Sequence, residues 1–380
     1  MEAEKKIKVA FISNYFTHHQ RALSDGLNSR CNYSFVETTQ MTEERKNMGW
    51  SIKDAPSYVY SLTEAPKQAL EKIAQADIVI VGNAPSGLVR DCLRRNQIVL
   101  RYNERPLKNG IEPIKFVPRF IRWHSQNPFW KRIYLLCASA YTAKDYARFG
   151  LFHRKAYRWG YFPEVKQYED IVEVLQKKEK GSLLWAGRFL DCKHPDAAIR
   201  LAVKLKAEGI PFSLKMIGSG PMEQNLRQLI VSEGLEDCVE LLGTMSPEQV
   251  RFHMEKANIF LFTSDYKEGW GAVLNEAMNS GCCVVACEAA GSVPYLIKHG
   301  HNGLSYPYGN ENALYAQVQM ALKSEEKMKQ FGKKAYEDMV NLWNGETAAE
   351  RLITLLQRIL AGERFPDVYL EGPGSKESVH

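Results

Sequence analysis

The chain has 380 residues, of which 45% are hydrophobic and 25% charged, and its formal net charge is +6 at pH 7. This length is long for one core and comfortable for two domains. No apolar run approaches the ~20 residues that a membrane span needs, so we expect no membrane-spanning helix.

The N-terminal segment MEAEKKIKVAFIS enters a strand pattern directly and lacks the apolar region and cleavage site of a signal peptide. We therefore expect a cytoplasmic protein. The eight cysteines lack the paired spacing of a disulfide framework or a zinc ribbon, so we expect reduced thiols.

Residues 1–163 are predicted to form a first α/β domain. The strand KIKVAFISN ends at Asn14, and a loop and a helix follow it. Further strands are predicted in YSFVETT, SYVYSL, DIVIVG, QIVLRYN and RIYLLCASA, and helices lie between several of them. The segment KAYRWGYFPEV is predicted to be the interdomain linker.

This half is basic: residues 1–164 carry 26 Lys and Arg against 15 Asp and Glu, a charge of +11, while the rest of the chain carries 24 against 29, a charge of −5. Residues 105–132 hold seven of these cations and one acid, Glu112, interleaved with Phe116, Phe120, Trp123, Phe129 and Trp130. Such a segment could lie on an anionic membrane surface, or it could pack as a helix with one wet face. Beyond charge there is no nucleic-acid motif, so we expect no nucleic-acid partner.

Residues 164–344 are predicted to form a second domain, in which the strands SLLWAG, FSLKMIG, CVELLG and NIFLFTS alternate with helices. Alternation at this spacing indicates a parallel sheet covered on both faces. A last amphipathic helix is predicted at 345–361. Residues 362–380 contain Pro and Gly among polar residues and are predicted to be a mobile tail.

The segment TSDYKEGWGAVLNEAM follows the last of these strands and is the strongest candidate for a site. Glu268 stands in its loop, and Glu276 lies on the helix that begins near Gly271. The free N–H groups of a helix start favour an anion, and glycines let a ligand approach the main chain. Two carboxylates beside such a site are suited to the hydroxyls of a sugar or a ribose. Taken without the context of a family, Glu268 is more often a loop charge and Glu276 a solvated helix residue.

The E-x7-E pattern in EGWGAVLNEAM resembles the signature of retaining GT-B glycosyltransferases, family 4 in particular, also called glycosyl transferases group 1. The segment LLWAGRFLDCKHPD resembles the family's strand followed by G-R and a lysine. The resemblance covers nearly all of residues 181–308. It implies two Rossmann-like parallel-sheet domains facing a central cleft, with the helix at 345–361 crossing back to the N-terminal domain.

The resemblance also implies roles for single residues. Glu268 would contact the transferred sugar, Glu276 would bind the ribose hydroxyls, and Arg188 and Lys193 would neutralise the donor diphosphate. The main chain between the two glutamates would complete the donor site, at Gly269, Trp270, Gly271, Ala272 and Val273. The chain has no D-x-D triplet, so we expect no metal, and we expect no cofactor besides the nucleotide-sugar substrate.

The N-terminal domain departs from the family at two loops. The first loop, where donor and acceptor meet in the family, has no glycine, and it offers His18 or His19 as a contact to the diphosphate or acceptor. The family often presents a histidine after the strand QIVLRYN, but this chain has Glu104 and Arg105 there. Glu104 is the substitute candidate for an acceptor-side base, and the alternatives are a structural pairing with Arg105 or a solvated loop.

The resemblance thus predicts transfer of a hexosyl unit from a nucleotide sugar to a glycan or lipid-linked acceptor, as in bacterial cell-surface polysaccharide or glycoconjugate assembly. The expected location is the cytoplasm, with peripheral binding to the inner face of the plasma membrane if the basic aromatic segment touches lipid. Two alternatives stay open: a nucleotide-sugar epimerase of the same fold, and a non-catalytic sugar-nucleotide or glycan binder. An epimerase would act on a donor alone.

Overall fold

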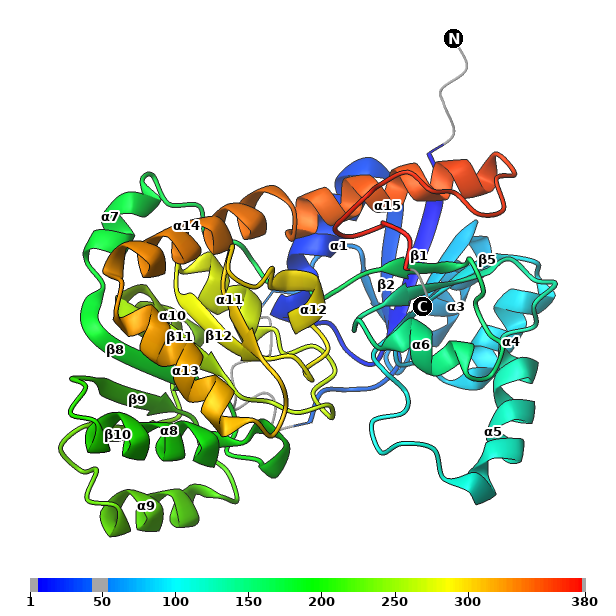
Figure 1. Ribbon diagram of the computed structural model, residues 1–380. Coiled ribbons are helices and arrows are strands. Elements are labelled where there is room, and N and C mark those ends of the chain that lie inside the picture. Colours follow the sequence, from blue (N-terminus) through cyan, green and yellow to red (C-terminus); the bar gives the residue numbers. More distant parts are fainter. Residues whose placement is uncertain (1–5, 43–53, 378–380) are drawn as a thin grey trace. The chain divides into compact units, whose positions relative to one another are not determined.

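The computed structural model describes residues 6–42 and 54–377, and its contacts divide the chain into two units (Figure 1). Unit 1 comprises residues 1–164 and 343–380, and unit 2 comprises residues 165–342. In the described residues each unit is built on one parallel sheet with helices packed on it, so the predicted α/β class is confirmed.

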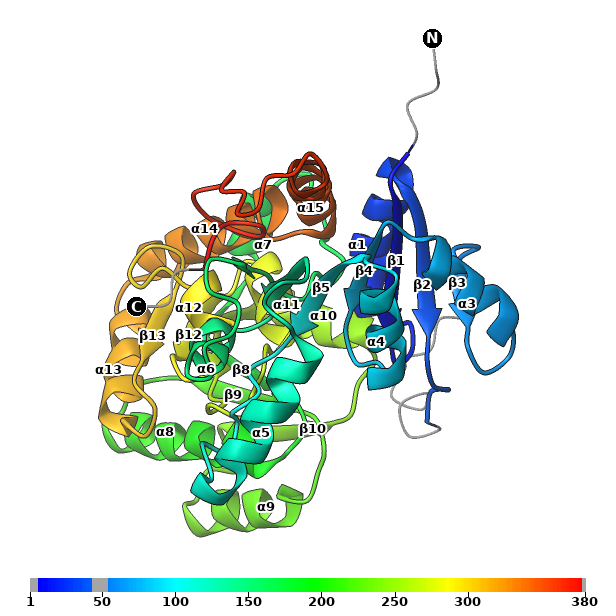
Figure 2. The ribbon, with the colours of Figure 1, turned by 90° about the vertical axis from the view of Figure 1, so that its right-hand side faces the viewer.

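The described part of unit 1 contains a seven-stranded sheet in the order β3-β2-β1-β4-β5-β6-β7 (Figure 2). The strands are β1 (Lys8–Ser13), β2 (Asn32–Glu37), β3 (Val59–Ser61), β4 (Ile78–Val81), β5 (Ile98–Asn103), β6 (Ile133–Cys137) and β7 (Ala156–Arg158). The helices are α1 (His18–Arg30), α3 (Pro66–Gln75), α4 (Ser86–Arg94), α5 (Pro113–Gln126), α6 (Thr142–Ala147) and α15 (Gly345–Leu360).

The central strands of unit 1 are short apolar runs because helices cover both faces of the sheet. All four residues of β4 are buried, as are all five of β6. A strand buried on both faces gains nothing from polar alternation, and it therefore reads as a continuous run of Val, Ile and Leu. This property made these strands predictable from the sequence.

Unit 2 contains, in its described residues, a six-stranded sheet in the order β10-β9-β8-β11-β12-β13. The strands are β8 (Glu179–Ala186), β9 (Ser213–Ile217), β10 (Val239–Gly243), β11 (Ala257–Phe262), β12 (Cys283–Cys287) and β13 (Leu304–Tyr306). The α-helices are α7 (Ile171–Gln176), α8 (Pro195–Ala207), α9 (Glu223–Ser232), α10 (Pro247–Lys256), α11 (Val273–Asn279), α12 (Val293–Leu296), α13 (Glu311–Leu322) and α14 (Glu325–Asn341). A 3-10 turn, η1 (Asp191–Lys193), precedes α8.

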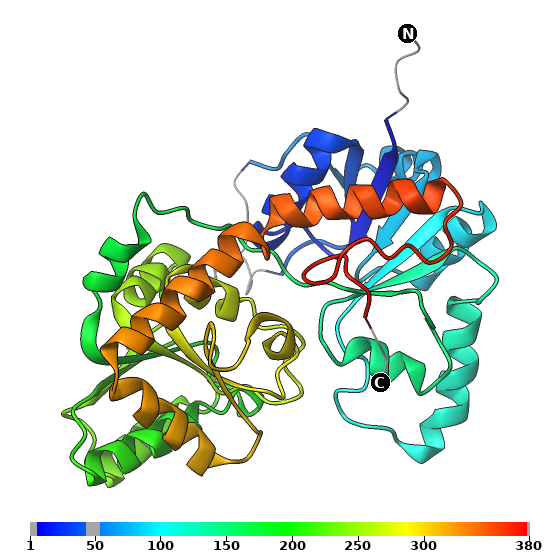
Figure 3. The ribbon, with the colours of Figure 1, turned by 45° about the horizontal axis from the view of Figure 1, so that its top comes forward.

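The last helix, α15, belongs to unit 1 and packs along α1 (Figure 3). Two glycines permit this close approach. A Cβ built on Gly26 would lie 2.9 Å from the Cβ of Ala349, and one on Gly345 would lie 2.5 Å from the backbone carbon of Ala22. The chain therefore returns to its N-terminal unit after completing unit 2.

Two expectations for unit 1 need correction. The segment predicted as the interdomain linker begins with β7, whose Ala156 and Tyr157 pair with β6. Residues 362–377 of the predicted mobile tail are also held in place: the N–H of Arg158 donates to the carbonyl of Ser375 at 2.8 Å, and the Tyr157 hydroxyl donates to the carbonyl of Pro366 at 3.0 Å. These partners are more than 200 residues apart, so local composition could not indicate them.

Candidate functional site

The sheet of unit 2 has a topological switch point between β8 and β11. From β8 the chain continues outward to β9 and β10 on one side, and it then returns to β11 on the other side of β8. Because all these strands are parallel, the loops after β8 and β11 leave the same edge of the sheet side by side. Ligands of open α/β sheets bind at such a point. Both predicted donor-site motifs lie in these two loops.

Hydrogen bonds tie the two loops to each other. The Thr263 hydroxyl donates to the carbonyl of Lys193 at 2.6 Å and accepts from the indole N–H of Trp185 at 2.8 Å. The N–H of Asp265 donates to the carbonyl of Cys192 at 2.9 Å. The loops are therefore held together by main-chain groups and by the Thr263 and Trp185 side chains, without any side chain of the predicted donor site.

Lys193 and Glu268 form an ion pair across these loops. Their side chains are only 17% and 16% exposed, so the charges meet in a partly desolvated environment. The Ser264 hydroxyl donates a further hydrogen bond to the same carboxylate oxygen of Glu268 at 3.3 Å. The structure thus brings together one predicted cation and one predicted carboxylate at the switch point.

Arg188, the other predicted cation, follows β8 and is exposed. Within the described residues its guanidinium has no hydrogen bond or ion pair, whereas Lys193 is already engaged by Glu268. The two cations therefore differ in the free protein, because one is solvated and the other is held.

The sequence Gly-Trp-Gly after Glu268 forms a tight loop anchored by a buried ring. The Trp270 side chain is fully buried, and its indole N–H donates to Asn275 at 2.9 Å. Gly271 has φ +82°, and a Cβ built there would lie 2.5 Å from Cζ of Phe262. Only glycine fits this position. Trp270 therefore shapes the loop from inside, and a ligand would meet the main chain of this loop rather than the ring.

Ala272 caps the start of α11 and Val273 is its first residue, so both lie at the helix start expected from the sequence. Gly269 is buried, while Gly271, Ala272 and Val273 are partly exposed. The structure places this run between Glu268 in the loop and Glu276 on the helix. Contact of these residues with a donor stays a prediction.

Glu276 is partly buried on α11. Burial raises the pKa of its carboxyl to about 7, against the opposing charge of Arg251 on α10. Arg251 itself donates to the side chain of Asn279 at 2.8 Å, one turn further along α11. Glu276 is therefore no solvated surface residue, and its environment differs from that of Glu268. That both carboxylates lie beside one anion-binding site stays a prediction.

Three polar residues beside the site were not predicted. Asp265 is buried directly after β11, and its carboxylate lies 3.2 Å from Nε2 of His194. His194 adopts a left-handed conformation with φ +46° between η1 and α8. Asp265 lies in the segment TSDYKEGWGAVLNEAM, just after an apolar strand, and this position could have indicated a site residue. The sequence offered no such indication for Arg251, because its approach to Glu276 depends on how α10 packs beside α11.

The remaining predicted residues lie in unit 1. The carboxylate of Glu104 accepts from Lys108 at 2.5 Å and from the Tyr161 hydroxyl at 2.7 Å. The alternative pairing of Glu104 with Arg105 is wrong, since Arg105 binds the buried Asp145 instead, at 3.2 Å and 3.3 Å. Glu104 is thus a paired carboxylate rather than a solvated one.

His18 and His19 open α1, with ring centroids 3.9 Å apart. Burial lowers the pKa of His19 to about 3, and the neighbouring His18 lowers it further in the same direction. His19 is therefore neutral at physiological pH and cannot act as a cation toward a phosphate. Contact of either ring with substrate stays a prediction.

Two kinds of feature are absent from the described residues. No helix in that part of the chain is long and apolar enough to cross a membrane. No group of three or more His, Cys, Asp and Glu side chains is placed there to hold a metal ion.

The candidate donor site lies in a part of the chain that is similar to a known protein family. Residues 167–338, less than half of the chain, match the family described as "Glycosyl transferases group 1". AmsK of Erwinia amylovora, an amylovoran biosynthesis glycosyltransferase, is 35% identical over 139 residues, which are 35% of this chain and 34% of AmsK. The chain thus spans about a third of the length of this relative.

Solved structures extend the likeness to nearly the whole chain. HepE of Anabaena, solved in complex with UDP, has a TM-score of 0.69 and 15% identity, covering 92% of this chain and 100% of that one. The pneumococcal O-GlcNAc transferase GtfA, solved with UDP and GlcNAc, has a TM-score of 0.67 and 12% identity, covering 94% and 100%. At these identities the likeness defines the fold. The chain has the two-domain GT-B fold, with a Rossmann-like parallel sheet in each domain, as predicted.

Proposed function

We propose that this chain is a retaining glycosyltransferase of family 4, which moves a hexosyl unit from a nucleoside-diphosphate sugar to an acceptor hydroxyl. The observation that carries the proposal is the Lys193–Glu268 pair at the switch point of unit 2, inside the segment that matches glycosyl transferases group 1. The name of AmsK supports a place in polysaccharide biosynthesis. We extend this to cell-surface polysaccharide or glycoconjugate assembly.

The proposed donor site uses the two cations in different ways. Departure of a nucleoside diphosphate builds negative charge on its distal phosphate, and fixed cations that meet this charge lower the barrier. Arg188 is solvated and would meet the diphosphate directly. Lys193 is held by Glu268, so its ammonium is already positioned when the donor arrives and loses little freedom on binding.

The two glutamates are proposed to recognise hydroxyl groups. Glu268 would turn toward the transferred sugar, and Glu276 toward the ribose. A carboxylate accepts hydrogen bonds from hydroxyls most strongly when it is ionised. Because the pKa of Glu276 is raised to about 7, the charge of its carboxyl changes with pH near neutrality. Ribose hydroxyls that donate to it would favour ionisation.

The acceptor is proposed to be a glycan or a lipid-linked sugar, bound by unit 1. Glu104 is the proposed base for the acceptor hydroxyl. Since Lys108 and Tyr161 already donate to it, the acceptor would have to replace one of these partners. His18 or His19 would contact the acceptor or the diphosphate. We further propose that the reaction needs no metal ion and takes place in the cytoplasm.

The first experiment is a thermal-shift screen of nucleotide sugars on the purified full chain, because a ligand that binds the folded state raises its melting temperature. The screen begins with UDP-sugars, since HepE and GtfA were solved with UDP. A stabilising donor is then incubated with and without oligosaccharide acceptors. We expect nucleoside diphosphate and an elongated acceptor only when both substrates are present.

Controls separate the alternatives. Conversion of the donor sugar without an acceptor would identify an epimerase, and stabilisation without any turnover would identify a binding protein. Turnover that persists in EDTA supports metal independence, and loss of turnover contradicts it. The anomeric configuration of the product, measured by NMR, tests retention, and inversion would refute that part of the proposal.

A further inference from the structure

Helix α5 of unit 1 carries apolar residues on two faces, and only one of them is packed. On the packed face Phe116 stacks on Phe149 with centroids 4.8 Å apart, and Trp123 meets the same ring at 4.7 Å. Trp123 is buried. This face anchors the helix on the described part of unit 1, within the cluster that also contains Leu107 and Tyr146.

The other face of α5 is apolar and exposed. Ile114, Val117 and Ile121 follow at spacings of three and four residues, which places them on one side of the helix. Ile114 is 90% exposed and Val117 is 61% exposed. A contiguous exposed apolar stripe of this kind on a soluble protein marks an interaction surface.

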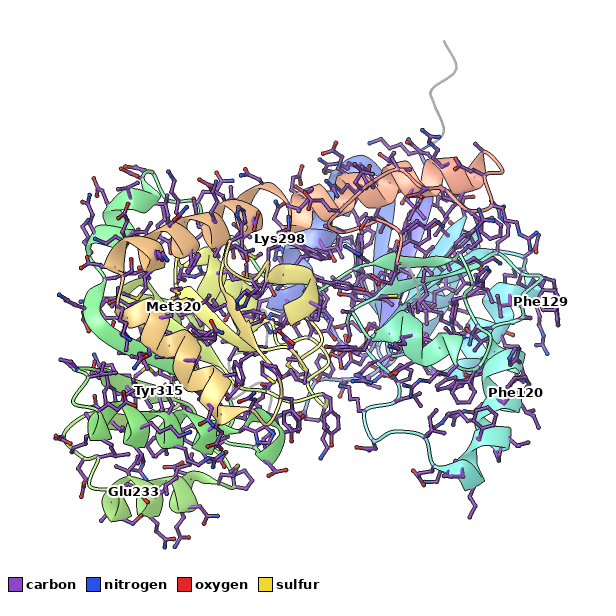
Figure 4. The ribbon with its side chains drawn as sticks, in the orientation of Figure 1. Phe120, Phe129, Glu233, Lys298, Tyr315 and Met320 are labelled. Atoms are coloured by element: carbon purple, nitrogen blue, oxygen red, sulfur yellow. The ribbon has the colours of Figure 1, made fainter. Side chains whose placement is uncertain are left out.

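Aromatic residues extend this stripe beyond the helix. Phe129 and Trp130 follow α5, and both are largely exposed, with their rings 5.1 Å apart in an edge-to-face contact. Figure 4 shows Phe120 and Phe129 at the same edge of unit 1. The α5 surface is defined here as Ile114, Val117, Phe120, Ile121, Phe129 and Trp130.

The charge around the α5 surface is positive. Helix α5 carries Lys115, Arg119 and Arg122 and no acidic residue, and Glu112 just before it pairs with Lys115 at 2.7 Å. Arg105 and Lys108 of the preceding loop add nothing to this charge, because they pair with Asp145 and Glu104. Arg122 is exposed on the helix, and within the described residues its side chain has no ion pair. Basic residues beside exposed aliphatic and tryptophan side chains suit the interface of an anionic bilayer, where charge meets lipid phosphates and apolar groups enter the acyl boundary.

A second copy of the chain fits this surface poorly. A symmetric dimer through α5 would place the same cations opposite one another, and like charges across an interface cost affinity. A nucleic acid would meet the cations, but it offers nothing for the aliphatic stripe between them. An anionic membrane offers phosphates to the cations and acyl chains to the aliphatic stripe.

The loop that leads into α5 is held firmly, so the surface is presented in a fixed orientation. Asp145 is buried and accepts from the guanidinium of Arg105 and, at 3.1 Å, from the N–H of Leu107. At the other end of the helix the guanidinium of Arg101 on β5 donates to the side-chain oxygen of Asn127 at 2.9 Å and to the carbonyl of Gln126 at 3.0 Å. We propose that the α5 surface binds an anionic lipid bilayer, with α5 lying in the plane of the interface.

Vesicle sedimentation with the full chain tests the proposal, and it does not depend on the proposed function because no activity is measured. We expect the chain to pellet with vesicles of equal parts phosphatidylglycerol and phosphatidylcholine, and not with phosphatidylcholine alone. The bound fraction should fall as salt rises, because surface attraction decays within a Debye length of ~8 Å at physiological ionic strength. Absence of pelleting with the anionic vesicles at low salt would overturn the proposal.

Substitutions distinguish binding through the α5 surface from non-specific adsorption to the vesicles. Val117→Asp combined with Ile121→Asp should lower binding about tenfold or more, because charges would enter the acyl boundary. Val231→Asp is the matched control, since Val231 is 63% exposed on α9 of unit 2, and it should leave binding unchanged. An equal loss in this control would overturn the proposal.

A charge variant gives an independent readout. Arg122→Gln should weaken binding about fivefold at low salt and much less at high salt, whereas Lys333→Gln, an exposed residue on α14, should have no effect. Analytical ultracentrifugation of the wild type and of the Val117 and Ile121 variant completes the test. A dimer that dissociates in the variant would assign the surface to a second copy and overturn the membrane proposal.

Discussion

The ammonium of Lys193 donates to the carboxylate of Glu268, and this ion pair joins the loop after β8 to the loop after β11. Because both side chains are mostly buried, neither charge is well solvated without the other. Two roles are therefore open to Lys193: it supports Glu268, or it binds the donor diphosphate. Substitutions at both positions distinguish these roles.

We predict that Lys193→Ala lowers kcat/KM by about 2–4 kcal/mol of transition-state stabilisation, because a fixed cation at the departing diphosphate is lost. The decisive measurement is the affinity for free nucleoside diphosphate in a double-mutant cycle with Glu268→Ala. If Lys193 binds phosphate, its removal weakens binding in both backgrounds. If Lys193 only supports Glu268, which does not contribute to this affinity, its removal should leave diphosphate binding unchanged in both backgrounds.

The matched control for this prediction is Lys206→Ala, which removes a lysine of unit 2 from an exposed ion pair with Asp237. We expect it to leave kcat/KM and diphosphate affinity unchanged, since surface ion pairs contribute little. Thermal unfolding of all variants reports whether the fold is intact. Arg188→Ala should resemble Lys193→Ala in activity while leaving stability near the wild-type value, because Arg188 is exposed.

The second prediction concerns the division of roles between the two glutamates. Free nucleoside diphosphate contains the ribose and lacks the sugar. Glu276→Ala should therefore weaken its binding, whereas Glu268→Ala should leave its affinity nearly unchanged and damage transfer. Calorimetric titration of both variants measures this directly. Equal losses of affinity would refute the proposed division.

The features of unit 2 that depend on local sequence, namely the strands β8, β9, β10 and β11 and the loops after them, were predicted correctly. Its buried parallel strands are apolar runs, and the family motifs placed Lys193 and Glu268 in loops after two of them. The sheet order, with β8 beside β11, then brings these loops together. The contact itself joins residues 75 apart in the chain, and it was not predicted, because the resemblance assigned each residue only a role toward the donor.

What the sequence missed depends on tertiary contacts. Nothing in the sequence indicated that the Trp270 ring is fully buried and donates to Asn275, although the predicted contact of its main chain with a donor is unaffected by this. Arg105 beside Glu104 suggests a local pair, but a buried carboxylate 40 residues away, Asp145, is its partner. Arg105 pairs with Asp145 because an unpaired buried charge is costly, whereas Glu104 has Lys108 and Tyr161 as its donors. The sequence alone does not show which carboxylate lies near Arg105 in the folded chain, so it could not decide between Glu104 and Asp145.

The third prediction tests the backbone of the glycine loop. Gly271→Ala should destabilise the protein by about 2 kcal/mol or more, since alanine disfavours φ +82° and its Cβ would collide with Phe262. Gly209 is the matched control, because it has φ +66° and open space around it. Gly209→Ala should cost about 1 kcal/mol, the conformational part alone. Urea unfolding compares the two, and equal losses would show that the contact with Phe262 is relieved at no cost.

The last prediction follows from the raised pKa of Glu276. Its folded-state pKa is about 7, against an ordinary value of 4.5, because burial disfavours the charged carboxylate. The folded protein therefore holds this proton more tightly than the unfolded chain does. The resulting contribution to stability is fully present below pH 4.5 and is lost as the pH rises through about 7.

Glu276→Gln removes this titration and keeps the shape of the side chain. Between pH 5 and pH 8 the wild type should lose about 2–3 kcal/mol of unfolding free energy relative to the variant, from a shift of this size at 1.36 kcal/mol per pH unit. Urea unfolding at both pH values measures the difference. Glu233→Gln on the same unit is the control: Glu233 is exposed, so its variant should follow the wild-type pH dependence. If the Glu276→Gln variant also followed the wild type, burial would not govern this carboxylate, and its ionisation near neutral pH could not couple to ribose binding.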